Sequence, residues 1–273
     1  MATTTTAAHF ASFHKPGDPL VIPNIWDLSS LNTVLSLNIS LGTALTPVRA
    51  VATASYAIAA TLIRIHQLAP RVRAAGLPLT VDIQDAYGDR LEDVVGAVVE
   101  AGAVGANVED IKDEKDAKEG EDLLYSLEEQ VKRLKRVLKV AADNGCPGFV
   151  VNARCDVMSP ASRRGAKDED VAEQERLLRE TIRRGKAYLA AGATTVFVWG
   201  GPQRGLRERE VRVLADAFGG RLAVKLGAGE DALSVKELAD MGVARISVGP
   251  SLYQAGNKTI RDTAERIVGG GRL

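Results

Sequence analysis

The sequence predicts an α/β fold of the closed (β/α)8 type, a TIM barrel. The first observation is alternation, because short apolar runs typical of buried strands alternate with segments whose apolar residues recur at helical spacing. The second is a glycine that stands just past a helical segment and before a strand at six places. The third is the length of 273 residues, close to the roughly 250 of such a barrel. We expect one barrel domain over residues 1–273, with residues 1–18 as an N-terminal extension.

Eight strands are predicted: Leu20–Ile22, Ala50–Ala52, Leu79–Val81, Gly105–Val108, Gly148–Val151, Thr195–Val198, Leu222–Leu226 and Arg245–Val248. The clearest helices are Arg90–Ala101 after an Asp89 cap, the capping boxes Ser126/Glu129 and Ser234/Glu237 with the segments they open, Asp168–Ala191, and Pro250–Val268. The helix-ending glycines are Gly76, Gly102, Gly145, Gly192, Gly219 and Gly242. An open doubly wound sheet is the competing fold, but its Gly-x-Gly-x-x-Gly signature does not follow the first strand.

Composition excludes several classes of protein. Lys plus Arg and Asp plus Glu both number 35, so the chain lacks the basic footprint of a nucleic-acid or anionic-membrane binder. No apolar run approaches the ~20 residues of a membrane span, and the N-terminus lacks the layout of a secretory signal. Two cysteines, Cys146 and Cys155, form no disulfide framework, so a reducing, cytoplasmic setting is expected.

Polar groups gather where the predicted strands end, which is where a barrel places its active site. This set consists of Asn24, Trp26, Asp27, Thr53, Ser55, Asp82, Gln84, Asp85, Glu109, Asp110, Asn152, Arg154, Asp156, Trp199, Lys225 and Ser247. It is rich in carboxylates and contains no histidine, which argues against a Ser-His-Asp triad or a zinc site.

These groups fit a site in which carboxylates hold a Mg²⁺ ion and Arg154 binds an anionic substrate through two hydrogen bonds. Two structural alternatives stay open at this stage. Asp82 and Asp85 could serve only a turn and the solvent, and Arg154 could form a salt bridge to Asp156 or Glu109 at the barrel rim.

Six motifs together resemble the isocitrate lyase/phosphoenolpyruvate mutase superfamily over nearly the whole chain, most closely its short, fungal-type phosphonomutase-like members. The motifs are residues 23–27 (Pro-Asn-Ile-Trp-Asp), 52–57 (Ala-Thr-Ala-Ser-Tyr-Ala), 82–88 (Asp-Ile-Gln-Asp-Ala-Tyr-Gly), 107–110 (Asn-Val-Glu-Asp), 151–156 (Val-Asn-Ala-Arg-Cys-Asp) and 243–250 (Val-Ala-Arg-Ile-Ser-Val-Gly-Pro). They occur in the superfamily's order and spacing.

The resemblance implies a Mg²⁺-dependent enzyme that acts on a 2-oxo acid or its enolate. It implies that Asp82 and Glu109 bind the metal, with Gln84 as a neutral ligand where the family usually has a second Asp. Substrate binding and catalysis would fall to Arg154, which binds the substrate carboxylate, and to Ser55 and Tyr56. The remaining pocket residues would be Trp26, Asp27, Thr53 and Ala57.

The chain departs from the family at its proton-transfer groups. The loop at residues 111–120 lacks the Cys and His of the lyases, and the segment after the second strand is short and lacks a catalytic Asp. We therefore expect a carbon–carbon lyase or phosphonomutase-like enzyme for a small oxaloacetate- or phosphonopyruvate-like acid, with no useful cleavage of isocitrate. The alternative is a catalytically weak or inactive barrel that binds a small anion or serves in assembly.

The predicted last helix, Pro250–Val268, has a stripe of apolar residues along one face. Members of the superfamily often exchange their last helix between subunits. The resemblance therefore implies a homodimer or homotetramer, with no nucleic-acid or membrane partner.

Overall fold

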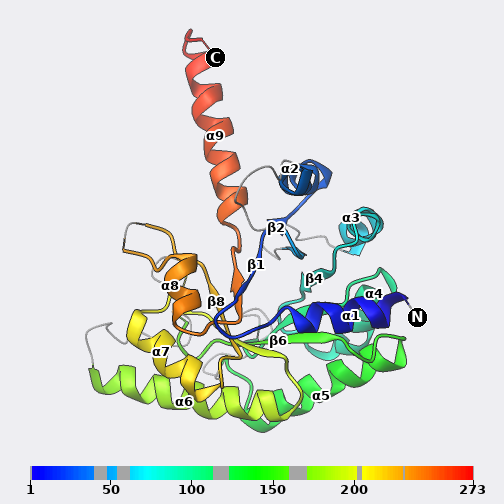
Figure 1. Cartoon of the computed structure of the whole chain (residues 1–273), viewed down its shortest axis with the longest axis vertical. Coiled ribbons are helices and arrows are strands. Elements are labelled where there is room, and N and C mark those ends of the chain that lie inside the picture. Colours follow the sequence, from blue (N-terminus) through cyan, green and yellow to red (C-terminus); the bar gives the residue numbers. More distant parts are fainter. Residues whose placement is uncertain are drawn as a thin grey trace.

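The computed structural model describes residues 2–39, 48–53, 62–112, 123–159, 171–201, 205–229 and 231–272. Within these residues a single parallel sheet runs in the order β1-β9-β8-β7-β6-β5-β4-β3-β2, with helices around its outside (Figure 1). The predicted (β/α)8 barrel is confirmed. None of the described helices is long and apolar enough to cross a membrane.

The first strand of the barrel is split in two by a proline. β1 (Leu20–Ile22) pairs with β9 (Arg245–Ser247), and β2 (Asn24–Ile25) pairs with β3 (Val51–Thr53). Pro23 lies between the halves and has no N–H to give to a neighbouring strand. The two halves therefore bond to opposite neighbours, and this closes the ring.

The other strands are β4 (Leu79–Asp82), β5 (Gly105–Glu109), β6 (Val150–Cys155), β7 (Thr195–Val198) and β8 (Leu222–Lys225). The helices are α1 (Ala2–Ser12), α2 (Leu28–Ile39), α3 (Leu62–Ala74), α4 (Leu91–Glu100), α5 (Leu127–Asp143), α6 (Val171–Ala190), α7 (Glu208–Ala217), α8 (Val235–Asp240) and α9 (Ser251–Val268). Each predicted strand is present with small shifts at its ends. The largest shift is in β6, which continues to Cys155, so Arg154 lies inside this strand rather than beyond it.

Local signals in the sequence explain most of the helix ends. The six predicted glycines all have positive φ, between 58° and 107°, a region that glycine enters without a steric penalty. Ser126 accepts a hydrogen bond from the Glu129 N–H at the start of α5. The predicted Asp89 cap is wrong, because residues 88–90 form a 3-10 turn and α4 begins after Arg90 without a side-chain cap.

Helix α1 lies under the amino ends of β5 and β6. Its Ala7 and Phe10 are fully buried, and a methyl group built on Gly105 would approach the Phe10 ring to 2.9 Å. The N-terminal segment thus packs against the barrel and closes its lower end.

Paired residues on neighbouring strands face the same side of a barrel, and the sides alternate along each strand. Arg245 reaches across the interior, where its Nη2 donates to the Asn107 Oδ1 at 3.1 Å, so both face inward. Asp82 is paired with Asn107, and Glu109 follows two residues later on β5, beside Arg154. Asp82, Glu109 and Arg154 therefore face inward at the carboxyl end of the barrel, which we call the mouth.

Helix α9 differs from the other helices. It extends away from the barrel as a rod (Figure 1), and none of its 18 residues is buried.

Candidate active site

Arg154 lies in β6 and faces the mouth. Its Nη1 contacts Glu109, its Nη2 donates to the Asp156 Oδ1 at 2.7 Å, and its Nε donates to the same oxygen at 3.1 Å. The guanidinium also lies over the Trp199 ring, 4.5 Å from the ring centroid. Both salt bridges considered from the sequence are therefore formed, and the side chain is held in one orientation at the mouth.

Negative charge exceeds positive charge around this guanidinium. Burial raises the pKa of Glu109 well above its usual range, Arg154 opposes this shift, and the nearby charge of Asp82 adds to it. Burial also raises the pKa of the fully buried Asp156 to about 6, although Arg154 again opposes the shift. Glu109 and Asp156 share the Arg154 guanidinium, and the charge of Asp82 lies nearby, so the carboxylates outnumber the guanidinium and favour a bound cation.

Asp82 and Glu109 are tied together through Gln84. The Gln84 N–H donates to the Asp82 Oδ1 at 3.2 Å, and the Glu109 N–H donates to the Gln84 carbonyl at 2.8 Å. These residues offer carboxylate and amide oxygens, the donors that Mg²⁺ prefers. Among the described residues, no group of three His, Cys, Asp or Glu side chains is placed as a metal site.

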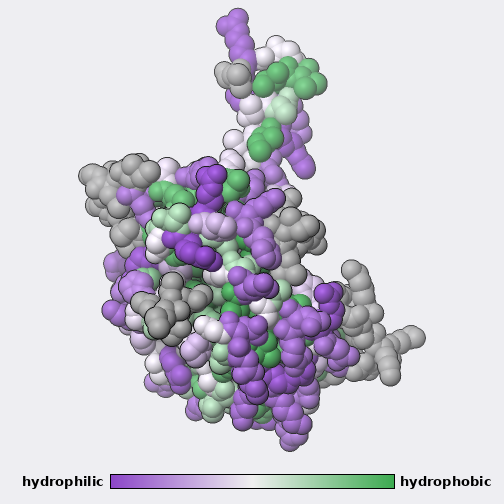
Figure 2. Space-filling view, turned by 90° about the vertical axis from the view of Figure 1, so that its right-hand side faces the viewer, coloured by the Kyte–Doolittle hydropathy of each residue, from purple (hydrophilic) through white to green (hydrophobic). Residues whose placement is uncertain are grey.

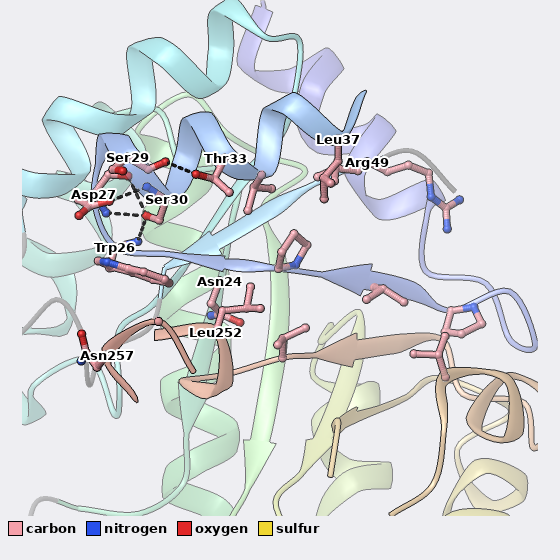
Figure 3. A pocket seen from close by; sticks show the side chains of 18 of the residues that line it. Asn24, Trp26, Asp27, Ser29, Ser30, Thr33, Leu37, Arg49, Leu252 and Asn257 are labelled. Atoms are coloured by element: carbon pink, nitrogen blue, oxygen red, sulfur yellow. Dashed lines mark hydrogen bonds between the residues drawn. The ribbon is translucent and has the colours of Figure 1, made fainter. Parts of the chain in front are cut away.

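Two predicted pocket residues that directly follow β2 serve local structure as well. The Asp27 Oδ1 accepts the Ser30 N–H at 2.7 Å at the start of α2. The Trp26 ring meets Tyr253 of α9 edge to face, with 5.3 Å between ring centroids. Trp26 and Asp27 therefore lie beside the start of α2 and the base of α9 (Figure 3).

Thr53 lies directly beside Asp82. It is buried, and its hydroxyl oxygen accepts the Asp82 N–H at 3.3 Å. Thr53 thus fixes the end of β4. Ser55, Tyr56 and Ala57, which were predicted to complete the pocket, lie outside the described residues.

A cavity of about 1050 Å³ lies outside the barrel wall. Its walls come from α2, α8, α9 and the first strand, and its lining is largely apolar, including Val34, Leu37, Val235, Leu252 and Ile260 (Figure 3). We call this cavity the groove. Trp26 and Asp27 lie at its edge, whereas Asp82, Glu109 and Arg154 are not part of its lining.

Sequence reasoning missed two residues that support the mouth from behind. Tyr125 donates to the Asp85 carboxylate at 2.7 Å, and Arg133 contacts the backbone of Asp85 and Gly88. Arg133 was hidden because it occupies a buried position on α5 beside apolar core residues. Tyr125 stands directly before the Ser126 cap, where only its position next to a helix start could have drawn attention.

One further cation is placed by strand register at the mouth. Lys225 is paired with Ser247, two residues after the inward-facing Arg245, and therefore faces inward at the end of β8. Burial lowers the pKa of its amine. Lys225 adds a second positive charge opposite the acidic strand ends.

Comparison with known proteins identifies the family to which the chain is similar. The profile described as phosphoenolpyruvate phosphomutase matches residues 10–268. An oxaloacetate decarboxylase of Bradyrhizobium diazoefficiens is 28% identical over 214 residues, which are 76% of this chain and 66% of the relative.

Solved structures agree with this assignment. A Burkholderia cenocepacia J2315 protein provisionally assigned as a phosphonomutase superposes with a TM-score of 0.77 at 31% identity, covering 98% of this chain and all of that one. A phosphonopyruvate hydrolase in complex with oxalate and Mg²⁺ has a TM-score of 0.71 at 20% identity, covering 97% of this chain and 88% of that one, and so shares the fold.

Proposed function

We propose that this chain, which belongs to the phosphoenolpyruvate phosphomutase family of enzymes, is a Mg²⁺-dependent lyase-type enzyme for a small 2-oxo acid. The observation that carries this proposal is the convergence of Asp82, Glu109 and Arg154 at the mouth. Two inward carboxylates and one guanidinium provide a site for a cation beside a site for an anion.

Arg154 is the residue that binds the substrate carboxylate. A guanidinium pairs with a carboxylate through two parallel hydrogen bonds, which fix the orientation of the ligand as well as its position. In the unliganded protein the partners of Arg154 are Glu109 and Asp156. Substrate carboxylate takes the Glu109 position on the guanidinium, while buried Asp156 continues to orient it from the other side.

Asp82, Glu109 and Gln84 would hold the metal, with Asp82 as the direct ligand. Bound there, Mg²⁺ would polarise the 2-oxo carbonyl and stabilise the enolate charge that develops when the neighbouring bond breaks. Release of Glu109 from Arg154 supplies the second carboxylate, so binding of the cation and binding of the anion support each other.

Oxaloacetate is the first substrate to test, because one relative is an oxaloacetate decarboxylase. It offers one carboxylate to Arg154 and a 2-oxo group next to the bond that breaks. Trp26, Asp27, Thr53, Ser55, Tyr56 and Ala57 are the proposed pocket residues around it. Ser55 and Tyr56 are also the proposed partners of Arg154 in catalysis.

The test is a panel of oxaloacetate, phosphonopyruvate, dimethylmalate and isocitrate, each assayed with Mg²⁺ and with chelator. Turnover of a small 2-oxo acid, dependent on Mg²⁺ and lost in Arg154→Ala, is the expected result. A blank without protein corrects for loss of CO₂ from oxaloacetate itself. Rapid cleavage of isocitrate would contradict the proposal, because the described strand ends offer no Cys or His facing the mouth for that reaction.

We also propose that the protein is a homodimer or homotetramer built through α9. Leu252, Ile260, Ile267 and Val268 are exposed, with 69% of Ile260 accessible, and apolar patches follow the helix on the face seen in Figure 2. An amphipathic helix of 18 residues gains its stability from packing of its apolar face. The apolar groove beside its base has matching character and would receive a second copy.

A further inference from the structure

The chain turns sharply directly after Asp82, and three residues there adopt left-handed backbone conformations. Gln84, Ala86 and Tyr87 have φ of 53°, 62° and 57°. None is glycine, so each β-carbon crowds its own backbone. Such strain persists only where surrounding contacts enforce it, and it concentrates at functional sites.

This strained turn controls the geometry of both proposed metal ligands. Gln84 binds the Asp82 carboxylate through its N–H and the Glu109 N–H through its carbonyl, at 3.2 and 2.8 Å. Rotation of the Gln84 backbone to an unstrained conformation would break both contacts. The spacing between Asp82 and Glu109 therefore depends on what holds the turn.

The turn is held by one buried carboxylate. Asp85 is 6% exposed; its Oδ1 accepts the Tyr87 N–H at 2.9 Å and its Oδ2 accepts the Tyr125 hydroxyl at 2.7 Å. Arg133 contacts the Asp85 carbonyl and donates to the Gly88 carbonyl at 3.2 Å. All of these contacts oppose relaxation of the left-handed residues.

Tyr125 and Arg133 are themselves held in place by further contacts. The Arg133 guanidinium lies 4.3 Å above the Tyr125 ring centroid, so the two side chains support each other. The Tyr125 N–H donates to the Asp110 carbonyl at 2.9 Å, and its carbonyl accepts from Arg184 of α6 at 2.9 Å. Tyr125 is thereby tied to the residue after Glu109 and to two helices.

We infer that Asp85, Tyr125 and Arg133 form a clamp that keeps the turn at residues 84–88 strained and so positions Asp82 and Glu109. These three are positioning residues, because they act through the turn rather than on a ligand. The inference deepens the proposed function and rests on Asp82 and Glu109 being the metal ligands. It gives Asp85 a role distinct from metal binding.

The experiment measures Mg²⁺ affinity by calorimetry, in the presence of oxalate, for Tyr125→Phe, Asp85→Asn and the double variant. We expect Tyr125→Phe to bind Mg²⁺ about tenfold more weakly. Because Tyr125 acts through Asp85, the two losses should not add. The double variant should bind Mg²⁺ no more weakly than whichever single variant has the lower affinity. Thr181→Val, which removes a buried hydroxyl hydrogen bond on α6, is the matched control and should keep the parental affinity.

Parental affinity in Tyr125→Phe would overturn the inference, and so would additive losses in the double variant. Failure of the parent to bind Mg²⁺ would instead refute the proposed function. Amide hydrogen exchange then tests the clamp without metal, since the Tyr87 N–H should exchange at least tenfold faster in Tyr125→Phe and in Asp85→Asn. Unchanged exchange there would refute the clamp itself.

Discussion

The mouth of the barrel and the groove beside α9 differ in almost every physical property. The mouth is crowded and charged, and its side chains bind one another, as in the contacts of Arg154 with Glu109 and Asp156. The groove is large and mainly apolar, with about 1050 Å³ between α2, α8 and α9. Buried, interacting charged groups are typical of a catalytic or binding site, whereas exposed apolar area is typical of an association surface.

Cavity volume alone would direct attention to the groove rather than to the mouth. A ligand pocket is often the largest apolar cavity with a few polar groups, but here the convergent polar groups lie elsewhere. The proposed assignment is substrate at the mouth and a second copy of the chain in the groove. Changes to Asp82, Glu109 or Arg154 should therefore leave association unaffected, and changes to the apolar stripe of α9 should leave Mg²⁺ binding unaffected.

The largest effect is expected for Arg154→Ala. Loss of the guanidinium that binds the substrate carboxylate should lower kcat/KM by about 10³-fold, roughly 4 kcal/mol of transition-state stabilisation. Arg154→Lys keeps the charge without the planar fork and should retain only a small part of the activity. Steady-state kinetics and the mass in solution are measured for the same variants. A change in the oligomer mass would show that the mouth and the groove are not independent.

Ile260→Asp should disrupt assembly at the groove. A charge on the exposed apolar stripe of α9 should weaken association by at least a hundredfold, which light scattering detects as a monomeric mass at micromolar concentration. Arg261→Asp introduces the same charge one residue away, on the polar side, and should keep the oligomer. The monomer should still bind Mg²⁺, because Asp82 and Glu109 come from one chain.

Acid should weaken the mouth before the groove. Burial raises the pKa of Glu109, with Arg154 opposing, and raises the pKa of Asp156 to about 6. Both groups therefore take up protons at a higher pH than ordinary carboxyls. Mg²⁺ must compete with the proton on Glu109, and Mg²⁺ affinity should fall by up to about tenfold per pH unit as this one ligand is protonated. A proton on Asp156 instead weakens the pairing that orients Arg154. The oligomer mass should not change over the same pH range.

The smallest effect concerns the strained turn. Ala86→Gly removes one buried methyl group but relieves a residue with φ of 62°, so the two effects should nearly cancel in the free energy of unfolding. Ala106→Gly removes an equally buried methyl from β5, which has no such strain, and should destabilise by about 1 kcal/mol. Denaturant unfolding compares the two. Equal losses would show that the turn is not strained.

The sequence predicted the barrel and the convergence of Asp82, Glu109 and Arg154 because these depend on local signals. Apolar runs define the strands, and the carboxyl ends of parallel strands meet at one end of a barrel. The division of the first strand at Pro23 was missed because it depends on the neighbouring strand to which each half is hydrogen-bonded. The Asp89 cap fails because left-handed residues lead into a 3-10 turn at residues 88–90, so α4 begins only after Arg90. Local pattern carries no information about Tyr125 or Arg133, whose roles depend on distant contacts.

Asp82 and Arg154 are proposed to form one site for Mg²⁺ and a 2-oxo acid. Calorimetric titration with oxalate, which mimics the enolate, tests it directly in the parent and in Asp82→Ala, with Mg²⁺ and with chelator. We predict binding by the parent that requires Mg²⁺ and is absent in Asp82→Ala. Equal oxalate binding in the parent and the variant, or binding unaffected by chelator, would contradict the account.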